Sequence, residues 1–196
     1  CFVTLYGQGS SKSGRFQSHP LEDNFDDDNE KATNGFILPN DAHKIQQLID
    51  KALSYSANAR IQATSCISLR EYITTEDVAA TVGRLGGIRM LLNSLRNHLD
   101  RPNIQAEAMC TLAEIHRVCP RLNETMHHGG CLDLAKLAME RHPYHVKVQQ
   151  MACRMFRSLS HDTKCCSKLK SKKVVSAVVD SIRRNPKKRD VMEEGR

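Results

Sequence analysis

Histidine and cysteine side chains gather between residues 127 and 145, and these are the side chains that most often bind zinc in proteins. The group is His127, His128, Cys131, His142 and His145. No pair within it has the CxxC or HxxxH spacing that is usual for zinc ligands, and adjacent residues such as His127 and His128 diverge on a helix. We therefore expect no metal site, and we interpret these histidines as helix-end residues close to backbone carbonyl groups.

Cys110 is the cysteine that helical spacing places nearest to solvent, so it is the first candidate for a nucleophile. Glu107 and Glu114 lie about one helical turn before and after it. Negative charge beside a thiol raises its pKa, which is the opposite of activation. The chain also shows no Ser, His and Asp order and no paired carboxylates at a strand end. We predict that the segment is not an enzyme and that it uses no cofactor and no small-molecule substrate.

Two stretches invite a phosphate-binding interpretation. Residues 7–14, GQGSSKSG, superficially resemble a nucleotide loop, but no strand precedes them and their glycine spacing does not match GxxxxGK[ST]. The second stretch is a basic run, for which there are three interpretations. It can be a localisation signal, a phosphate-binding patch, or solvated charge at a turn between helices. Its members are Arg183, Arg184, Lys187, Lys188 and Arg189. The sequence leaves these three interpretations open.

The net charge of +7 is unevenly distributed along the 196 residues. Residues 1–39 are acidic and rich in Gly and Ser, with little apolar periodicity, so we expect a disordered or linker-like segment. The rest of the chain is basic, which suits acidic partners or nucleic acid, although solvated Lys and Arg on helices are the commoner reason. Aromatic residues make up only 5% of the chain and Trp is absent, which favours thin layers of helices over a β-sandwich.

Eight cysteines without a paired framework favour a reducing compartment, and we predict a cytoplasmic or nuclear location. We find no signal peptide, and the apolar run 174–179 is far shorter than the roughly 20 residues that cross a bilayer. We therefore expect no membrane partner. Because the chain begins at Cys1 and stops inside a fourth repeating unit, we expect it to be a fragment of a longer array or protein.

Apolar residues recur at helical spacing from Asp41 onward, with Asn40 or Asp41 as the expected first cap. A second helix follows SYSAN, and Thr75 is expected to start a short third helix. The later helices are expected at 88–98, 103–118, 122–128, 131–141, 145–160 and 163–169, with a further unit starting at Val174.

These helices form a repeat of 43 to 44 residues. Gly86 and Gly129 are 43 positions apart, which places Cys131 in a column with Ile88. Each column of the longest helices keeps both size and polarity, as stacked repeats require. The columns are Ile61-Gln62, Ile104-Gln105 and Val148-Gln149; Ser65, Ala108 and Ala152; Cys66, Met109 and Cys153; Leu69, Leu112 and Phe156; and Tyr72, Ile115 and Leu159.

This pattern resembles the armadillo repeat family, to which importin-α and β-catenin belong. The resemblance covers residues 41–196 and rests on Gly86-Gly87, Gly129-Gly130 and the Val/Ile-Gln-x-x-Ala-x-x-x-Leu run. The sequence departs from the family pattern in the first and fourth units, where His43-Lys44 and Lys172-Lys173 replace the glycine pair. HEAT repeats are the close rival. The resemblance implies an all-α, right-handed α-solenoid of about three complete repeats and a truncated fourth.

The resemblance also implies a concave groove, lined by the third helix of each repeat, that binds extended peptides or proteins. Helical spacing then places twelve side chains in the groove: Arg60, Thr64, Ile67, Glu71, Asn103, Glu107, Cys110, Glu114, Lys147, Met151, Arg154 and Ser158. The Trp and Asn pair of importin-α-like grooves is missing, so we do not expect a nuclear-import receptor. We predict a non-catalytic protein-interaction scaffold. The alternatives are a basic surface for nucleic acid or acidic partners, and a structural spacer in a larger multidomain protein, with or without an enzymatic domain.

Overall fold

The computed structural model describes residues 39–160, 169–170, 172–185 and 189–195, and every regular element in these ranges is helical. The all-α fold class is therefore confirmed. Residues 1–38 of the expected acidic segment lie outside the described residues. So does nearly all of the helix expected at 163–169. The elements are α1 (Pro39–Ser54), α2 (Ala59–Tyr72), α3 (Glu76–Arg84), α4 (Gly87–Asn97), α5 (Pro102–Val118), η1 (Pro120–Leu122), α6 (Asn123–His128), α7 (Cys131–Arg141), α8 (Val146–Leu159), α10 (Lys172–Arg184) and α11 (Arg189–Glu194).

Local capping groups explain where several helices begin. The Asn58 side chain accepts hydrogen bonds from the Arg60 and Ile61 N–H groups in the first turn of α2. Thr75 accepts one from the Val78 N–H in the first turn of α3, as its position predicts. Pro102 occupies the first turn of α5, where its missing N–H leaves no bond unmade. The expected cap at Asn40 or Asp41 is wrong, because α1 already begins at Pro39.

The glycine pairs before α4 and α7 adopt a left-handed backbone at one residue each. Gly86 has φ of 89° and Gly130 has φ of 78°, a region that side chains with a Cβ rarely adopt. Gly86 and Gly130 are each the residue just before a helix, so the structural period is 44 here and not the 43 read from Gly129. Cys131 consequently aligns with Gly87, and the expected column with Ile88 is wrong.

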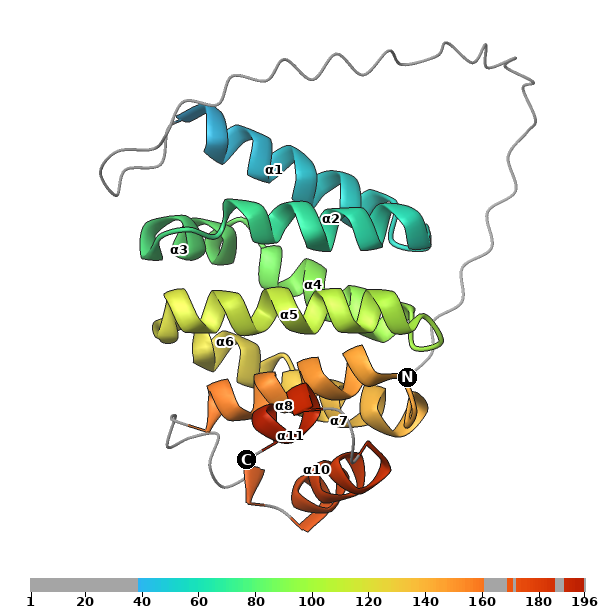
Figure 1. Cartoon of the computed structure of the whole chain (residues 1–196). Helices are drawn as coiled ribbons and strands as arrows, with labels where there is room; N and C mark the ends of the chain where they lie inside the picture. The colour runs from blue at the N-terminus through green and yellow to red at the C-terminus, as the bar shows by residue number, and fades with distance from the viewer. Residues whose placement is uncertain (1–38, 161–168, 171, 186–188, 196) are drawn as a thin grey trace, which may run out of the picture. The chain divides into compact units, whose positions relative to one another are not determined.

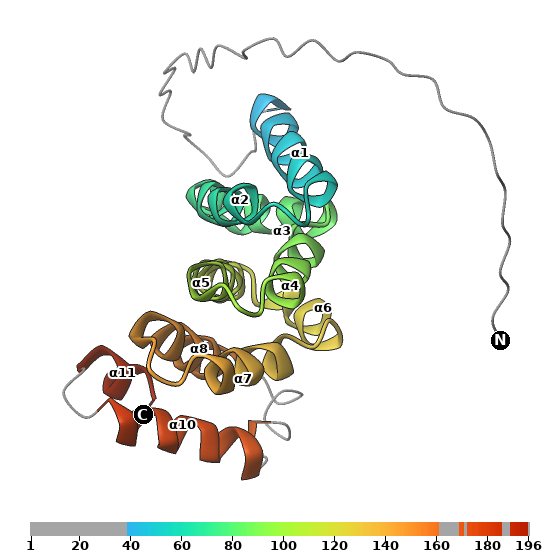
Figure 2. The same ribbon diagram turned by 90° about the vertical axis from the view of Figure 1, so that its right-hand side faces the viewer.

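Two layers of helices hold the core between them (Figure 1). In one layer α2 packs against α5, α5 against α8 and α8 against α11; in the other, α1 packs against α4, α4 against α7 and α7 against α10. Figure 2 shows α2, α5 and α8 following one another on one side, with α1, α4 and α7 on the other. Side chains such as Leu69, Leu91, Leu112 and Leu132 are buried between the layers.

The glutamine column explains how each long helix is joined to the one before it. Gln105 is buried, and its side-chain amide donates to the carbonyl oxygens of Leu95 at 2.9 Å and His98 at 2.8 Å, at the end of α4. Gln62 and Gln149 make the equivalent pairs of bonds to the ends of α1 and α7. These bonds satisfy carbonyl groups that a helix end would otherwise leave unpaired.

Among the described residues, no helix has the length and apolar character needed to cross a membrane.

Candidate partner-binding site

The predicted groove residues all lie on α2, α5 and α8 or immediately beside them, and we call the surface they form the third-helix face. Six of the twelve are exposed, namely Arg60, Thr64, Ile67, Glu71, Asn103 and Lys147. Four are half-buried, namely Cys110, Glu114, Arg154 and Ser158. Because α2, α5 and α8 lie side by side, the prediction that these side chains come from neighbouring helices agrees with the packing.

Two predicted groove residues are buried instead. Glu107 and Met151 are each only 7% exposed, and Met151 belongs to the hydrophobic core. They occupy equivalent positions 44 residues apart on α5 and α8, whereas Thr64, at the same position of α2, is exposed. Met151 is therefore not available to a partner, which corrects its place in the predicted set. Spacing along one helix could not show how closely the next helix approaches.

Glu107 links the three long helices through charge. Its carboxylate pairs with the Arg70 guanidinium on α2 at 2.6 Å and with the Lys147 ammonium on α8. Burial favours the neutral acid, but hydrogen bonds from Lys147 and Arg70, together with their charges, outweigh burial and lower the Glu107 pKa. The buried carboxylate is thus ionised and bridges α2, α5 and α8.

Glu114 forms a second connection between α5 and α8. It accepts a hydrogen bond from Arg117 Nε at 3.0 Å on its own helix, and it lies 3.5 Å from Arg154 Nη2 on α8. The hydrogen bond from Arg117 lowers the Glu114 pKa against partial burial, and the positive charges of Arg117 and Arg154 add to the effect. One carboxylate is therefore shared by two guanidinium groups.

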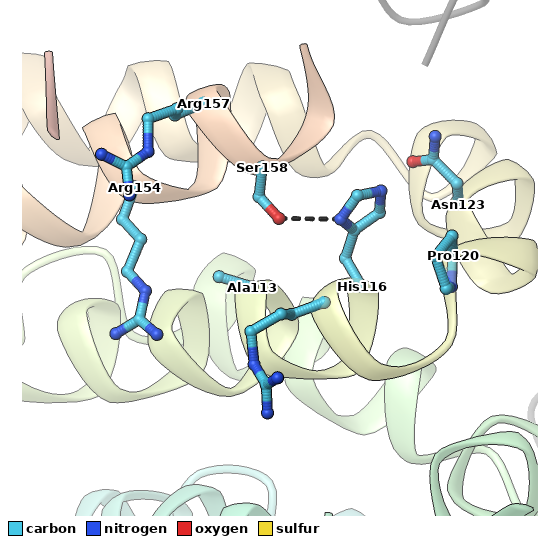
Figure 3. Close-up of a pocket in the computed structure, with 8 residues that line it drawn as sticks. Ala113, His116, Pro120, Asn123, Arg154, Arg157 and Ser158 are labelled. Carbon is cyan, nitrogen blue, oxygen red and sulfur yellow. Dashed lines mark hydrogen bonds between the residues drawn. The ribbon is translucent and has the colours of Figure 1, made fainter. Parts of the chain in front are cut away.

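A cleft of about 520 Å³ opens between the C-terminal halves of α5 and α8 (Figure 3). The His116 ring and the Ser158 hydroxyl point toward one another across it, with 2.7 Å between Nδ1 and Oγ. Arg154 lies toward one end and Pro120 and Asn123 toward the other (Figure 3). The full lining is Ala113, His116, Arg117, Pro120, Asn123, Arg154, Arg157 and Ser158. We call this the α5–α8 cleft.

Only Arg154 and Ser158 of this cleft belong to the predicted groove set. His116 and Arg117 were missed because they lie at the end of α5, beyond the positions counted from the core columns. One available signal was the separation of 42 residues between His116 and Ser158, which is close to the repeat length. Side chains about one repeat apart in sequence meet when neighbouring repeats pack together.

The basic run is only partly described. Arg183 and Arg184 are exposed at the end of α10, and Arg189 is the first residue of α11. Lys187 and Lys188 lie outside the described residues. The role of this basic patch therefore stays a prediction.

The histidines between residues 127 and 145 have separate roles. His142 Nε2 lies 2.7 Å from the Leu99 carbonyl oxygen, as a helix-end histidine near a carbonyl should. His145 departs from that interpretation, because its ring accepts from the Val148 N–H at the start of α8. Within the described ranges, no group of three or more His, Cys, Asp or Glu side chains is arranged to hold a metal ion.

Two further cysteines have buried thiol groups. Burial raises the pKa of Cys66 to about 12 and that of Cys153 to about 11, so both remain protonated at neutral pH. Cys110 is half-buried on the third-helix face. Cys66 and Cys153 belong to the hydrophobic core, and Cys110 packs against it.

Comparisons with protein-family models, with curated proteins and with solved structures found no match to this chain. The functional argument therefore rests on the geometry of the third-helix face and the α5–α8 cleft.

Proposed function

We propose that this chain is a protein-interaction scaffold whose third-helix face binds an extended segment of a partner protein. The proposal includes the armadillo-like arrangement expected from the sequence, with α2, α5 and α8 as the third helices of successive repeats. The observation that carries it is the lateral packing of these helices, which presents equivalent side chains at regular intervals. An extended peptide has a similarly regular series of side chains, so one strand can contact several repeats.

Charge on the face supports a protein partner over nucleic acid. Arg60 and Lys147 are exposed cations, while Glu71 is an exposed anion on the same helix as Arg60. A nucleic acid backbone requires a run of positive charge, whereas a peptide can match both signs in register. We therefore place the nucleic-acid alternative second.

A charge swap across α5 and α8 tests this proposal. The double variant Glu114→Lys with Arg154→Glu keeps opposite charges on the two helices, but it reverses the charge that a partner meets at each position. We expect the full chain carrying this swap to lose at least about tenfold in affinity for partners captured by the wild-type protein, because like charges replace complementary ones. Quantitative capture from cell extract followed by direct affinity measurement gives the comparison.

The matched control is a second ion pair between neighbouring repeats. The two atoms that pair are 2.6 Å apart, with Arg141 at the end of α7 and Asp100 in the turn between α4 and α5, and neither residue belongs to the third-helix face. Exchanging these two residues should leave partner affinity unchanged. Equal binding by the wild type and by the Glu114/Arg154 swap would remove the third-helix face as the binding surface.

A further inference from the structure

We propose that the α5–α8 cleft binds the phosphoryl group of a phosphorylated serine or threonine in the partner segment. The inference rests on the proposed function, since it requires a peptide lying on the third-helix face. It adds the chemical class of the side chain recognised at one defined place.

Positive charge in the cleft exceeds the negative charge that pairs with it. Arg117 and Arg154 share the single carboxylate of Glu114, and Arg157 pairs with Glu194 at 3.1 Å. Three guanidinium groups thus face two carboxylates. The 3.5 Å between Arg154 and Glu114 is longer than the roughly 2.7–2.9 Å of a strong charge-assisted bond, so the donors of Arg154 are the least engaged.

Packing of the repeats does not require these cations. The positions equivalent to Arg154 are Ile67 on α2 and Cys110 on α5, and the position equivalent to Arg117 is Thr74. At the α2–α5 contact the same places are therefore filled by apolar or neutral side chains, and those helices still pack together. Ligand binding explains why these cations are present at the α5–α8 contact and absent from the α2–α5 contact.

Small and apolar side chains leave room for the ligand. Ala113 lies in the column that holds Arg70 on α2 and Arg157 on α8, and it is 3% exposed in the lining of the cleft. Pro120 adds an apolar edge. A partly dry wall strengthens the attraction between a bound anion and the guanidinium groups.

A phosphate monoester fits this donor set better than a carboxylate does. It carries about 1.5 to 2 negative charges at neutral pH and three acceptor oxygens, against one charge and two oxygens for Asp or Glu. Planar guanidinium groups bind phosphate oxygens in pairs, and the Ser158 hydroxyl is a further hydrogen-bonding group beside His116.

The experiment compares three pools of short degenerate peptides that differ only at a fixed central residue, which is phosphoserine, serine or glutamate. We expect the full chain to bind the phosphoserine pool about tenfold or more tightly than either other pool. Arg154→Ala should abolish this preference, and Arg154→Lys should retain only part of it because lysine lacks the paired donors. Arg89→Ala, which removes an exposed cation from α4 outside the third-helix face, is the matched control and should leave the preference intact.

Several outcomes would overturn the inference. These are equal binding of the serine pool, equal binding of the glutamate pool, or an unchanged preference in the Arg154 variants. Competition by inorganic phosphate at the same concentration as the phosphopeptides would assign the cleft to a free anion instead. If Arg154→Ala fails to fold, Arg154→Lys and Ser158→Ala carry the test. A wild-type chain that captures partners but shows no phosphoserine preference overturns this inference alone. Unchanged capture by the Glu114/Arg154 charge swap overturns the proposed function.

Discussion

At the level of single residues, two equivalent helix contacts differ by one hydroxyl group, which is present in the first contact and absent from the second. The Gln62 side-chain oxygen accepts a hydrogen bond from Ser94 Oγ at 2.6 Å. The residue equivalent to Ser94 on α7 is Ala138, 44 positions later. The corresponding oxygen of Gln105 is buried and has no hydrogen-bond partner within the described part of the chain. An unpaired buried acceptor of this kind costs stability.

Supplying the hydroxyl should therefore stabilise the fold. We predict that Ala138→Ser raises the free energy of unfolding by about 0.5–1.5 kcal/mol, through one new buried hydrogen bond. The converse substitution Ser94→Ala should lower it by about 1–3 kcal/mol, because it leaves the Gln62 oxygen unpaired. Urea denaturation measures both. Ala135→Ser, a buried control one turn earlier on α7, should destabilise, and a similar loss at Ala138 would show that Gln105 gains no partner.

The buried carboxylate of Glu107 makes stability depend on pH. Its pKa in the folded chain is lower than the ordinary value of about 4.3 for glutamate. The ionised group therefore contributes its full stabilisation above the ordinary pKa, and this contribution is lost as the pH falls through the lower folded-state pKa.

We predict that Glu107→Gln lowers the free energy of unfolding by about 1–3 kcal/mol at pH 7, since it removes charge-assisted bonds to Arg70 and Lys147. The difference from wild type should shrink as the pH falls below the ordinary glutamate pKa and through the lower pKa of the folded chain, where the wild-type carboxylate loses its charge. Denaturation curves at neutral and acid pH give both values. Glu140→Gln, in an exposed pair with Lys136, is the control and should cost less than about 0.5 kcal/mol. A pH-independent cost at Glu107 would mean that packing, and not charge, holds it.

At the scale of the elements, the turn before α7 depends on one backbone conformation. Gly130 has φ of 78°, and a Cβ built there would meet no atom within 4 Å. Substitution at this position thus tests backbone strain without steric overlap. We predict that Gly130→Ala costs about 1–2 kcal/mol of stability, and that Gly130→Asn costs less because asparagine tolerates the left-handed region. Thermal unfolding of the two variants decides this, and an equal cost for Asn and Ala would contradict it.

The sequence predicts the helices well because their signals are local. The expected range 131–141 coincides with α7, and Thr75 caps α3 as expected, since capping groups and apolar spacing act within a few residues. Non-local contacts set the rest. The burial of Met151 depends on the approach of neighbouring helices, and the α5–α8 cleft depends on His116 and Ser158 meeting across two helices. The spacing of residues along one helix carries no information about how closely neighbouring helices approach or which of their side chains meet.

At the scale of the whole described helical region, each long helix touches its neighbour in the layer. The helix α5 packs against α2 on one side and α8 on the other, and its Glu107 pairs with both. If these helices form the proposed repeat array, stability is a sum of repeat and neighbour terms, and damage should weaken with distance along the array. A compact cooperative domain would instead lose stability everywhere at once.

Two equivalent leucines separate these behaviours. Leu69 on α2 and Leu112 on α5 are both fully buried and occupy the same column, so truncating either to alanine should cost about 2–5 kcal/mol. We predict that Leu112→Ala reduces hydrogen-exchange protection in α2, α5 and α8 together, because α5 contacts both of the other helices. Leu69→Ala should reduce protection in α1, α2 and α5 and leave α8 close to wild type. Mass-spectrometric hydrogen exchange on the full chain reads out each helix separately. If both variants lowered protection equally in all helices, neighbour-by-neighbour coupling would be excluded, and with it the repeat array on which the binding proposal depends.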